Sequence, residues 1–191
     1  MHRHFRIYKP YGYLSQFITN QKTRRNKKLL GELYNFPDGT MSIGRLDEDS
    51  EGLLLLTTDG KVSAEITGSN VEKEYYVQVD GEITLEAVAK LRNGVEIGFN
   101  GKKYITKPGK ADILKAPPAF PPRAKPIRDS RHGPSSWISI TLTEGKFRQV
   151  KKMTAAVGFP TLRLVRVRIG KELLGNLDAG EVQEVPEFKL Y

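Results

Sequence analysis

The chain has 191 residues, of which 38% are hydrophobic and 28% are charged, a balance typical of a folded soluble protein and not of a disordered or membrane-spanning one. It has no cysteine, which excludes disulfides, thiolate nucleophiles and cysteine-bound zinc. The 31 Lys and Arg residues against 22 Asp and Glu residues give a net charge of +9, which favours a polyanionic partner such as nucleic acid over an ordinary basic surface.

The N-terminal part of the chain is predicted to form short strands around an acidic loop. Alternating side chains favour a strand over residues 3–8, which ends at the turn-forming Lys9-Pro10-Tyr11-Gly12. A cationic loop follows over residues 22–28, and a helix is predicted that runs through Leu29, Leu30 and Leu33 and stops before Pro37. The other elements predicted here are strands over residues 42–46, 53–57 and 73–79 and a short helix over residues 61–66.

The rest of the chain alternates irregularly between helices and strands. Thr84 can cap a helix that carries Leu85, Val88 and Leu91 on one side and ends at Gly94. Asn100-Gly101 favours a tight hairpin turn between strands over residues 95–99 and 103–106, whereas the proline-rich residues 116–134 predict a long loop. The last predicted elements are a strand over residues 136–143, a helix over residues 147–157 and a strand over residues 161–169. This order, without a glycine-rich phosphate loop, predicts an α+β fold.

The last predicted helix has an apolar side and a cationic side. Phe147, Val150 and Val157, with Met153 or Thr154, are expected to form the apolar side. Arg148, Lys151 and Lys152 lie three or four residues apart on another side. A solvated charged face explains such a run, and contact with the phosphates of a nucleic acid is the functional alternative.

An acidic loop, Asp47-Glu48-Asp49-Ser50-Glu51, separates two predicted strands and follows Gly44-Arg45-Leu46. Strand ends are good platforms for catalytic side chains because the sheet holds their backbone, although an ordinary polar turn has the same pattern. The acids also match the early positions of an EF-hand calcium loop, but Thr58 occupies the position that requires glutamate. The segment therefore does not predict a calcium site.

Four motifs in sequence order resemble those of the ribosomal pseudouridine synthases. They are Lys9-Pro10-Tyr11-Gly12, Gly44-Arg45-Leu46-Asp47, Lys73-Glu74-Tyr75 and the run EGKFRQVKKM over residues 144–153. Together they span nearly the whole chain. The resemblance is to the branch that contains the small-subunit type A and the large-subunit types B, E and F, and within it to the E type, which lacks an S4 RNA-binding domain.

The resemblance implies a fold and an activity. The implied fold is a single catalytic domain over residues 1–191, with lobes of about 1–68 and 69–191, a long mixed and mostly antiparallel sheet, a central cleft and no S4 domain. The implied activity is the isomerisation of a uridine of 23S ribosomal RNA to pseudouridine after base flipping. Because this reaction neither adds nor removes atoms, we expect no cofactor and no metal.

The resemblance also assigns roles to individual residues. Asp47 would act as a nucleophile at C1′ or as a base at C2′, and Tyr75 would stack on the target base, with Tyr76 on the other face of its strand. Lys151 occupies the position of a cation that would orient Asp47, although many relatives have arginine there. Whether Lys151 or Arg45 pairs with Asp47 stays open. The residues expected to bind RNA are Arg45, Arg148, Lys152, Arg24, Arg25, Lys27 and Lys28.

The expected partner is large-subunit ribosomal RNA, free or in an assembling particle, and the chain is expected to act as a monomer without a membrane. The N-terminus has no apolar stretch followed by a cleavage site, so we expect a cytoplasmic protein. A non-catalytic RNA-binding protein and a basic nuclease are the competing classes. Asp47, Tyr75 and a basic Lys151 argue against the first, and the lack of histidine partners for Asp47 and Asp49 argues against the second.

Overall fold

The computed structural model describes residues 1–19 and 27–191, and the chain forms two compact units. The first unit contains residues 1–71, 121–125 and 166–191, and the second contains residues 72–120 and 126–165. The sequence predicted contiguous lobes with a boundary at 68–69, whereas here the C-terminal segment returns to the first unit. It returns because β13 (Val182–Val185) pairs antiparallel with β1 (His4–Lys9), with Ile7 opposite Val182.

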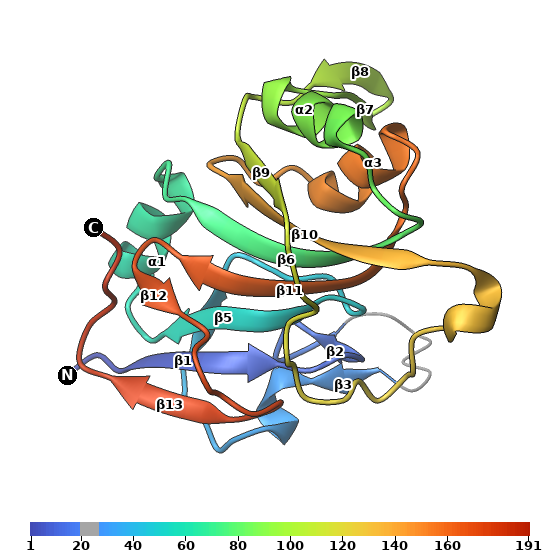
Figure 1. Cartoon of the computed structure of the whole chain (residues 1–191). Coiled ribbons are helices and arrows are strands. Elements are labelled where there is room, and N and C mark those ends of the chain that lie inside the picture. The colour runs from blue at the N-terminus through green and yellow to red at the C-terminus, as the bar shows by residue number, and fades with distance from the viewer. Residues whose placement is uncertain (20–26) are drawn as a thin grey trace. The chain divides into compact units, whose positions relative to one another are not determined.

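The first unit is built on a sheet in which β13, β1, β5 and the end of β11 follow one another (Figure 1). In this sheet β1 and β4 both pair antiparallel with β5, and a separate parallel pair joins β2 and β3. The elements of this unit, besides β1 and β13, are β2 (Tyr13–Leu14), β3 (Lys28–Leu29), the 3-10 helix η1 (Leu30–Glu32), β4 (Met41–Ile43), β5 (Glu51–Thr57), α1 (Gly60–Gly68) and β12 (Glu172–Leu173), while β11 (Thr161–Ile169) contributes its last residues.

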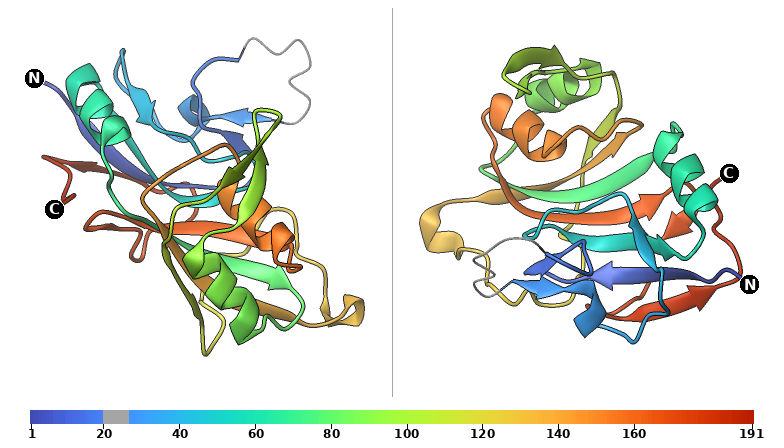
Figure 2. Two further views of the ribbon diagram at one scale, coloured as in Figure 1. Left: turned by 90° about the horizontal axis from the view of Figure 1, so that it is seen from above. Right: turned by 180° about the vertical axis from the view of Figure 1, so that it is seen from behind.

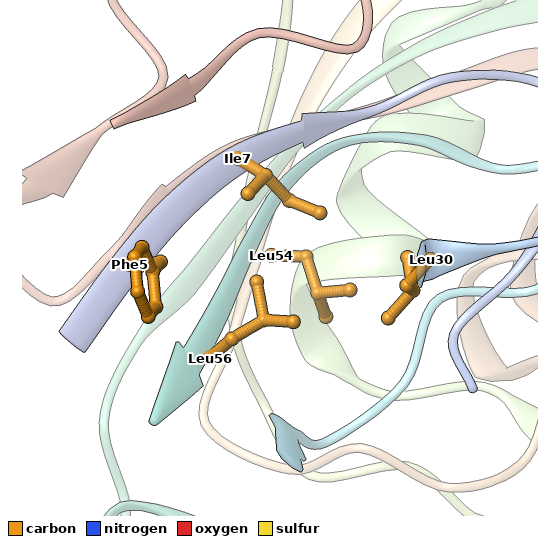
Figure 3. Packing of buried hydrophobic residues seen from close by; sticks show 5 residues of the cluster. All are labelled: Phe5, Ile7, Leu30, Leu54 and Leu56. Carbon is orange, nitrogen blue, oxygen red and sulfur yellow. The ribbon is translucent and has the colours of Figure 1, made fainter. Parts of the chain in front are cut away.

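The core of the first unit depends on β5, whose seven residues are all buried. Four consecutive leucines leave this strand no polar face, which is the pattern that predicted a buried strand. Leu54 and Leu56 pack with Phe5 and Ile7 of β1 and with Leu30 (Figure 3). The helix predicted from Leu29 to just before Pro37 is only the short η1, because Lys28 and Leu29 pair with β2 instead.

Gly52 lets β5 approach the C-terminal half of β11. Its φ is +106°, and a Cβ placed there would lie 2.3 Å from the backbone oxygen of Arg166. Only glycine fits such an approach without moving one backbone. The side chain of Arg166 is also buried, and its Nε donates a 2.8 Å hydrogen bond to the carbonyl of Leu53.

The second unit has β6 and β10 at its centre, an antiparallel pair in which Tyr75 lies opposite Ile140. On the other side of β10, β9 continues the sheet in antiparallel fashion. The elements of this unit are β6 (Lys73–Asp80), α2 (Leu85–Asn93), β7 (Glu96–Phe99), β8 (Lys102–Ile105), β9 (Lys110–Ile113), the 3-10 helix η2 (Ser130–His132), β10 (Ser135–Leu142), α3 (Gln149–Ala156) and the first residues of β11.

Several turn and cap predictions in the second unit are confirmed. Thr84 caps α2, since its side chain accepts a hydrogen bond from the N–H of Ala87, and Gly94 ends the helix with φ +109°. The prediction that Leu85 shares the apolar side of this helix is wrong: the buried side is formed by Ala87, Val88 and Leu91, and Leu85 at the first position is 78% exposed. Asn100 and Gly101 both have positive φ, as the predicted tight turn between β7 and β8 requires. Figure 2 shows this hairpin, α2 and α3 grouped together in the second unit.

The observed elements make the chain an α+β protein with mostly antiparallel pairing, as the sequence predicted. Within residues 1–19 and 27–191, no helix has the length and apolar character needed to cross a membrane.

Candidate active site

Asp47 lies in a loop of the first unit, residues 44–50, that joins β4 to β5. Gly44 ends β4 by adopting φ +69°, so this strand stops before the predicted end at residue 46. The N–H of Ser50 donates a 3.0 Å hydrogen bond to the carbonyl of Asp47 and closes the loop into a turn. The side chain of Asp47 is half-buried, whereas Arg45 is exposed.

The residue before Asp47 is held by Ser15. The hydroxyl of this buried serine donates to the carbonyl of Leu46 at 2.8 Å and accepts from the N–H of Leu46 at 2.9 Å. One side chain thus satisfies both backbone groups of Leu46, as a neighbouring strand would. Ser42 adds a hydrogen bond to the carbonyl of Ser15 at 3.0 Å.

The residue after Asp47 is held by the Lys9–Gly12 motif. The carbonyl of Glu48 accepts hydrogen bonds from the N–H of Gly12 at 2.9 Å and from Nζ of Lys9 at 3.2 Å. Nζ of Lys9 also donates to the carbonyls of Pro10 and Tyr13, at 2.9 and 2.8 Å. Asp47 therefore sits between two residues whose backbones are fixed by residues 9–15.

Lys9 is an unusual lysine because its side chain is fully buried. Burial lowers its pKa from the ordinary 10.5 to about 7, since a charge is costly away from water. Four carboxylates act in the opposite direction: Glu51, Asp49, Asp47 and Glu48. The sequence identified the motif but gave no role to this side chain, or to Ser15, because burial cannot be read from either residue type.

In the second unit, Tyr75 and Tyr76 take opposite faces of β6, as predicted. Tyr75 is 9% exposed and shares its face with the buried Val77 and Val79. Tyr76 is half-buried on the other face, where its ring centre lies 6.1 Å from that of Phe120.

The cationic residues predicted in the last helix belong to α3 or to its cap. Lys151 and Lys152 are half-buried in α3, and Nζ of Lys152 donates to the carbonyl of Gly98 at 2.9 Å. Arg148 is exposed and has a left-handed backbone with φ +51°, so the helix begins only at Gln149.

The prediction that Phe147 joins the apolar side of this helix is wrong. Phe147 precedes the left-handed Arg148 and is 67% exposed, while Val150, Met153 and Thr154 form the buried side. Because the left-handed backbone of Arg148 interrupts the helical repeat, the side chain of Phe147 does not fall on the same side as Val150.

The family model described as RNA pseudouridylate synthase matches residues 3–156. The chain belongs to the RNA pseudouridylate synthase family. It is 42% identical to a protein named ribosomal large subunit pseudouridine synthase E from Vibrio parahaemolyticus, over 93% of this chain and 71% of that protein. It is 43% identical to a protein of the same name from Xanthomonas axonopodis pv. citri, over 85% of this chain and 83% of that protein. The family resemblance that the four motifs indicated is confirmed.

A crystal structure of a pseudouridylate synthase is similar to this RNA pseudouridylate synthase with a TM-score of 0.75 and 28% sequence identity. The match covers 97% of this chain and 70% of that chain. Together with the antiparallel pairs described above, it confirms the predicted fold class.

The basic residues expected to bind RNA lie in several places on the synthase. Arg24 and Arg25 lie outside the described residues. Lys27 forms an ion pair with Glu48 at 3.3 Å, and the ammonium of Lys28 lies 5.5 Å from the ring centre of Tyr13. Among residues 1–19 and 27–191, no group of three or more acidic or histidine side chains is arranged to hold a metal ion.

A carboxylate network anchors the segment that leads into α3. Glu144 accepts hydrogen bonds from the hydroxyl of Tyr104, from the N–H of Lys107 at 2.7 Å and from Nε2 of Gln149 at 2.8 Å. Burial raises the pKa of Glu144, but these hydrogen bonds lower it by more. The pKa of Glu144 is therefore below the ordinary value of 4.5. The same contact raises the pKa of Tyr104.

We predict that Glu144→Gln lowers the free energy of unfolding by about 1–3 kcal/mol at neutral pH. The neutral amide cannot accept all the hydrogen bonds that the charged carboxylate accepts, and those that remain are weaker. The folded-state pKa is depressed, so this stability is present above the ordinary pKa of 4.5 and is lost as the pH falls through the folded-state value. Urea unfolding at several pH values measures it. Glu86→Gln, which only breaks an exposed pair with Lys90, is the control and should change stability by less than about 1 kcal/mol. A difference that stays constant into the acid range would contradict the prediction.

Proposed function

We propose that this chain converts a uridine of large-subunit ribosomal RNA into pseudouridine, with Asp47 as its essential carboxylate. The proposal rests on the hydrogen bonds that fix the backbone on both sides of Asp47, which belongs to a family motif. Ser15 holds Leu46, and Lys9 and Gly12 hold Glu48. The names of the relatives from Vibrio and Xanthomonas support the large subunit as the source of the RNA.

The chemistry of the isomerisation explains why a fixed carboxylate is useful. The N1–C1′ bond breaks, the base turns, C5 joins C1′, and the C5 proton leaves while N1 gains one. No atom is gained or lost overall, so the reaction needs no cofactor or energy source. A carboxylate at the ribose can either attack C1′ or take a proton from C2′, and both roles require a defined position.

The other candidate residues complete the proposal. Tyr75 stacks on the flipped base and its hydroxyl assists removal of the C5 proton, a role that its place in the Lys73-Glu74-Tyr75 motif supports. Lys151 or Arg45 orients Asp47. Arg148, Lys152, Lys27 and Lys28, with the Arg24 and Arg25 pair, contact phosphates, as the net charge of +9 supports. The chain works as a monomeric catalytic domain in the cytoplasm.

Mapping pseudouridines in ribosomal RNA tests this function. In a strain that lacks the gene, we expect one large-subunit uridine to stay unmodified while all small-subunit sites are unchanged. Expression of the wild-type chain restores the site, and expression of Asp47→Asn does not. If every large-subunit site stays modified in the deletion strain, the ribosomal assignment is wrong.

A further inference from the structure

One surface of the second unit combines aromatic rings with lysines near the start of α3. It comprises Phe99 and Tyr104 of the β7–β8 hairpin and Lys146, Phe147 and Lys152 around the first turn of α3, and is called here the aromatic–lysine surface. The hairpin and α3 lie beside each other in Figures 1 and 2. None of the functions proposed above uses Phe99, Tyr104, Lys146 or Phe147.

The contacts within this surface are specific. Nζ of Lys146 lies 5.3 Å from the ring centres of both Phe99 and Tyr104. Nζ of Lys152 lies 5.3 Å from the ring centre of Phe147 and 6.0 Å from that of Phe99. The ammonium groups therefore interact with rings at cation–π distance, which holds both charges at the surface next to flat apolar groups.

Phe147 is the exposed element of this surface. A single exposed apolar side chain needs no special explanation, and several on this chain are exposed. Phe147 differs because a backbone turn presents it and a lysine lies beside its ring: the left-handed Arg148 excludes it from α3, and Lys152 lies against it. Its 67% exposed ring is open to a flat partner.

The charge of the surface indicates the chemistry of that partner. The carboxylate of Glu144, which bonds to Tyr104 of this surface, also accepts hydrogen bonds from Lys107 and Gln149. An ammonium carries three donors, so the bond from Lys152 to the carbonyl of Gly98 leaves capacity for a phosphate oxygen. Proteins that bind single-stranded nucleic acids combine aromatic rings, on which bases stack, with cations that bind the phosphates.

We propose that the aromatic–lysine surface binds an unpaired nucleotide of the RNA substrate, with its base stacked on Phe147 and its phosphates at Lys146 and Lys152. The inference rests on the proposed function in taking RNA as the substrate. It adds a contact separate from the reacting uridine, because Phe147 belongs to none of the candidate catalytic residues.

Binding of a short oligocytidylate tests the inference apart from catalysis, because this RNA has no uridine to react. We expect Phe147→Ala to weaken binding about tenfold, equivalent to about 1.4 kcal/mol, while Phe147→Trp binds at least as well as the wild type. The salt dependence of binding should be unchanged in Phe147→Ala and reduced in Lys146→Met, because only the lysine releases counterions. An oligomer of the same length with abasic riboses should bind the wild type and Phe147→Ala equally.

Leu85→Ala is the matched control, since Leu85 is a 78% exposed apolar residue of the same unit on α2, and its binding should equal that of the wild type. Equal oligocytidylate affinity of the wild type and Phe147→Ala overturns the inference, as does equal affinity of the wild type for the abasic oligomer. Neither result bears on pseudouridine formation. Conversely, a chain that binds as expected but modifies no ribosomal uridine would refute the proposed function alone.

Discussion

Replacing Asp47 with asparagine is expected to stop pseudouridine formation while RNA binding survives. The variant keeps the shape of the side chain but removes the charge that, in the proposed function, would attack C1′ or take the C2′ proton, so turnover should fall by at least about a thousandfold. Tritium release from RNA labelled at uridine C5 measures this directly, because C5 loses its hydrogen when it joins C1′. Filter binding of the same RNA separates loss of chemistry from loss of affinity.

Glu48→Gln is the matched control for Asp47→Asn. Glu48 is the next residue in the same loop, its side chain pairs with Lys27, and its backbone carbonyl, which fixes the loop, is unchanged by the substitution. We expect its turnover to stay within about threefold of the wild type, as the loss of one part-exposed ion pair has a small effect. Comparable turnover in Asp47→Asn and Glu48→Gln would remove Asp47 from the mechanism.

Replacing Lys9 with methionine is expected to impair both stability and turnover. The substitution leaves the carbonyls of Pro10, Tyr13 and Glu48 without the Nζ donor, and the loss of a donor to part-buried acceptors costs about 1–3 kcal/mol. The Glu48 carbonyl then keeps only its hydrogen bond from the N–H of Gly12, so Asp47 is held less firmly, and kcat should fall about tenfold or more while RNA affinity changes little. Urea unfolding and tritium release measure the two effects.

The stability effect of Lys9→Met should depend on pH in a defined direction. The unfolded chain holds a proton on Lys9 up to about pH 10.5, and the folded chain only up to about pH 7. The unfolded state therefore binds more protons between these values, and the folded wild type gains stability as the pH rises from about 7 to about 10. The advantage of the wild type over Lys9→Met should be larger near pH 9 than near pH 6.

Lys61→Met provides the comparison, since Lys61 is an exposed lysine of the same unit. If the difference between the wild type and Lys9→Met is the same across this pH range, the burial of Lys9 does not lower its pKa. If kcat is unchanged, the hydrogen bond to Glu48 does not position Asp47.

Much of the fold could be predicted where local chemistry determines the structure. Several features depend only on residues that are close in sequence. They are the four leucines of β5, the alternation in β6, the Thr84 cap and the Asn100-Gly101 turn. β11 was predicted with its observed bounds, and β1, β6 and β10 within one residue or two. The short strands β2, β3, β9, β12 and β13 were missed, because two to four residues carry too little periodicity and depend on their partners.

The site could be predicted in part. The motifs led to Asp47 and Tyr75 as candidates, a prediction that stays open. The residues that hold the loop around Asp47 could not be predicted, because they depend on contacts between distant segments, such as Ser15 with Leu46. Phe147 was misplaced for a related reason. Its spacing from Val150 fits a helix, but the left-handed backbone of Arg148 breaks the period, and a non-glycine residue gives no sequence signal for that conformation.

The close approach at Gly52 has a consequence for the order of folding. β5 follows the Asp47 loop directly, and its Leu53 carbonyl is bonded by Arg166, a residue 113 positions later in the chain. Contacts between such distant residues form slowly, because a large loop must close before the contact contributes any stability. During synthesis, β5, which follows the Asp47 loop, therefore lacks its contacts with β11 until β11 has been made. We expect the carboxylate to become fixed among the last steps of folding, so that an unfinished chain is not yet a catalyst.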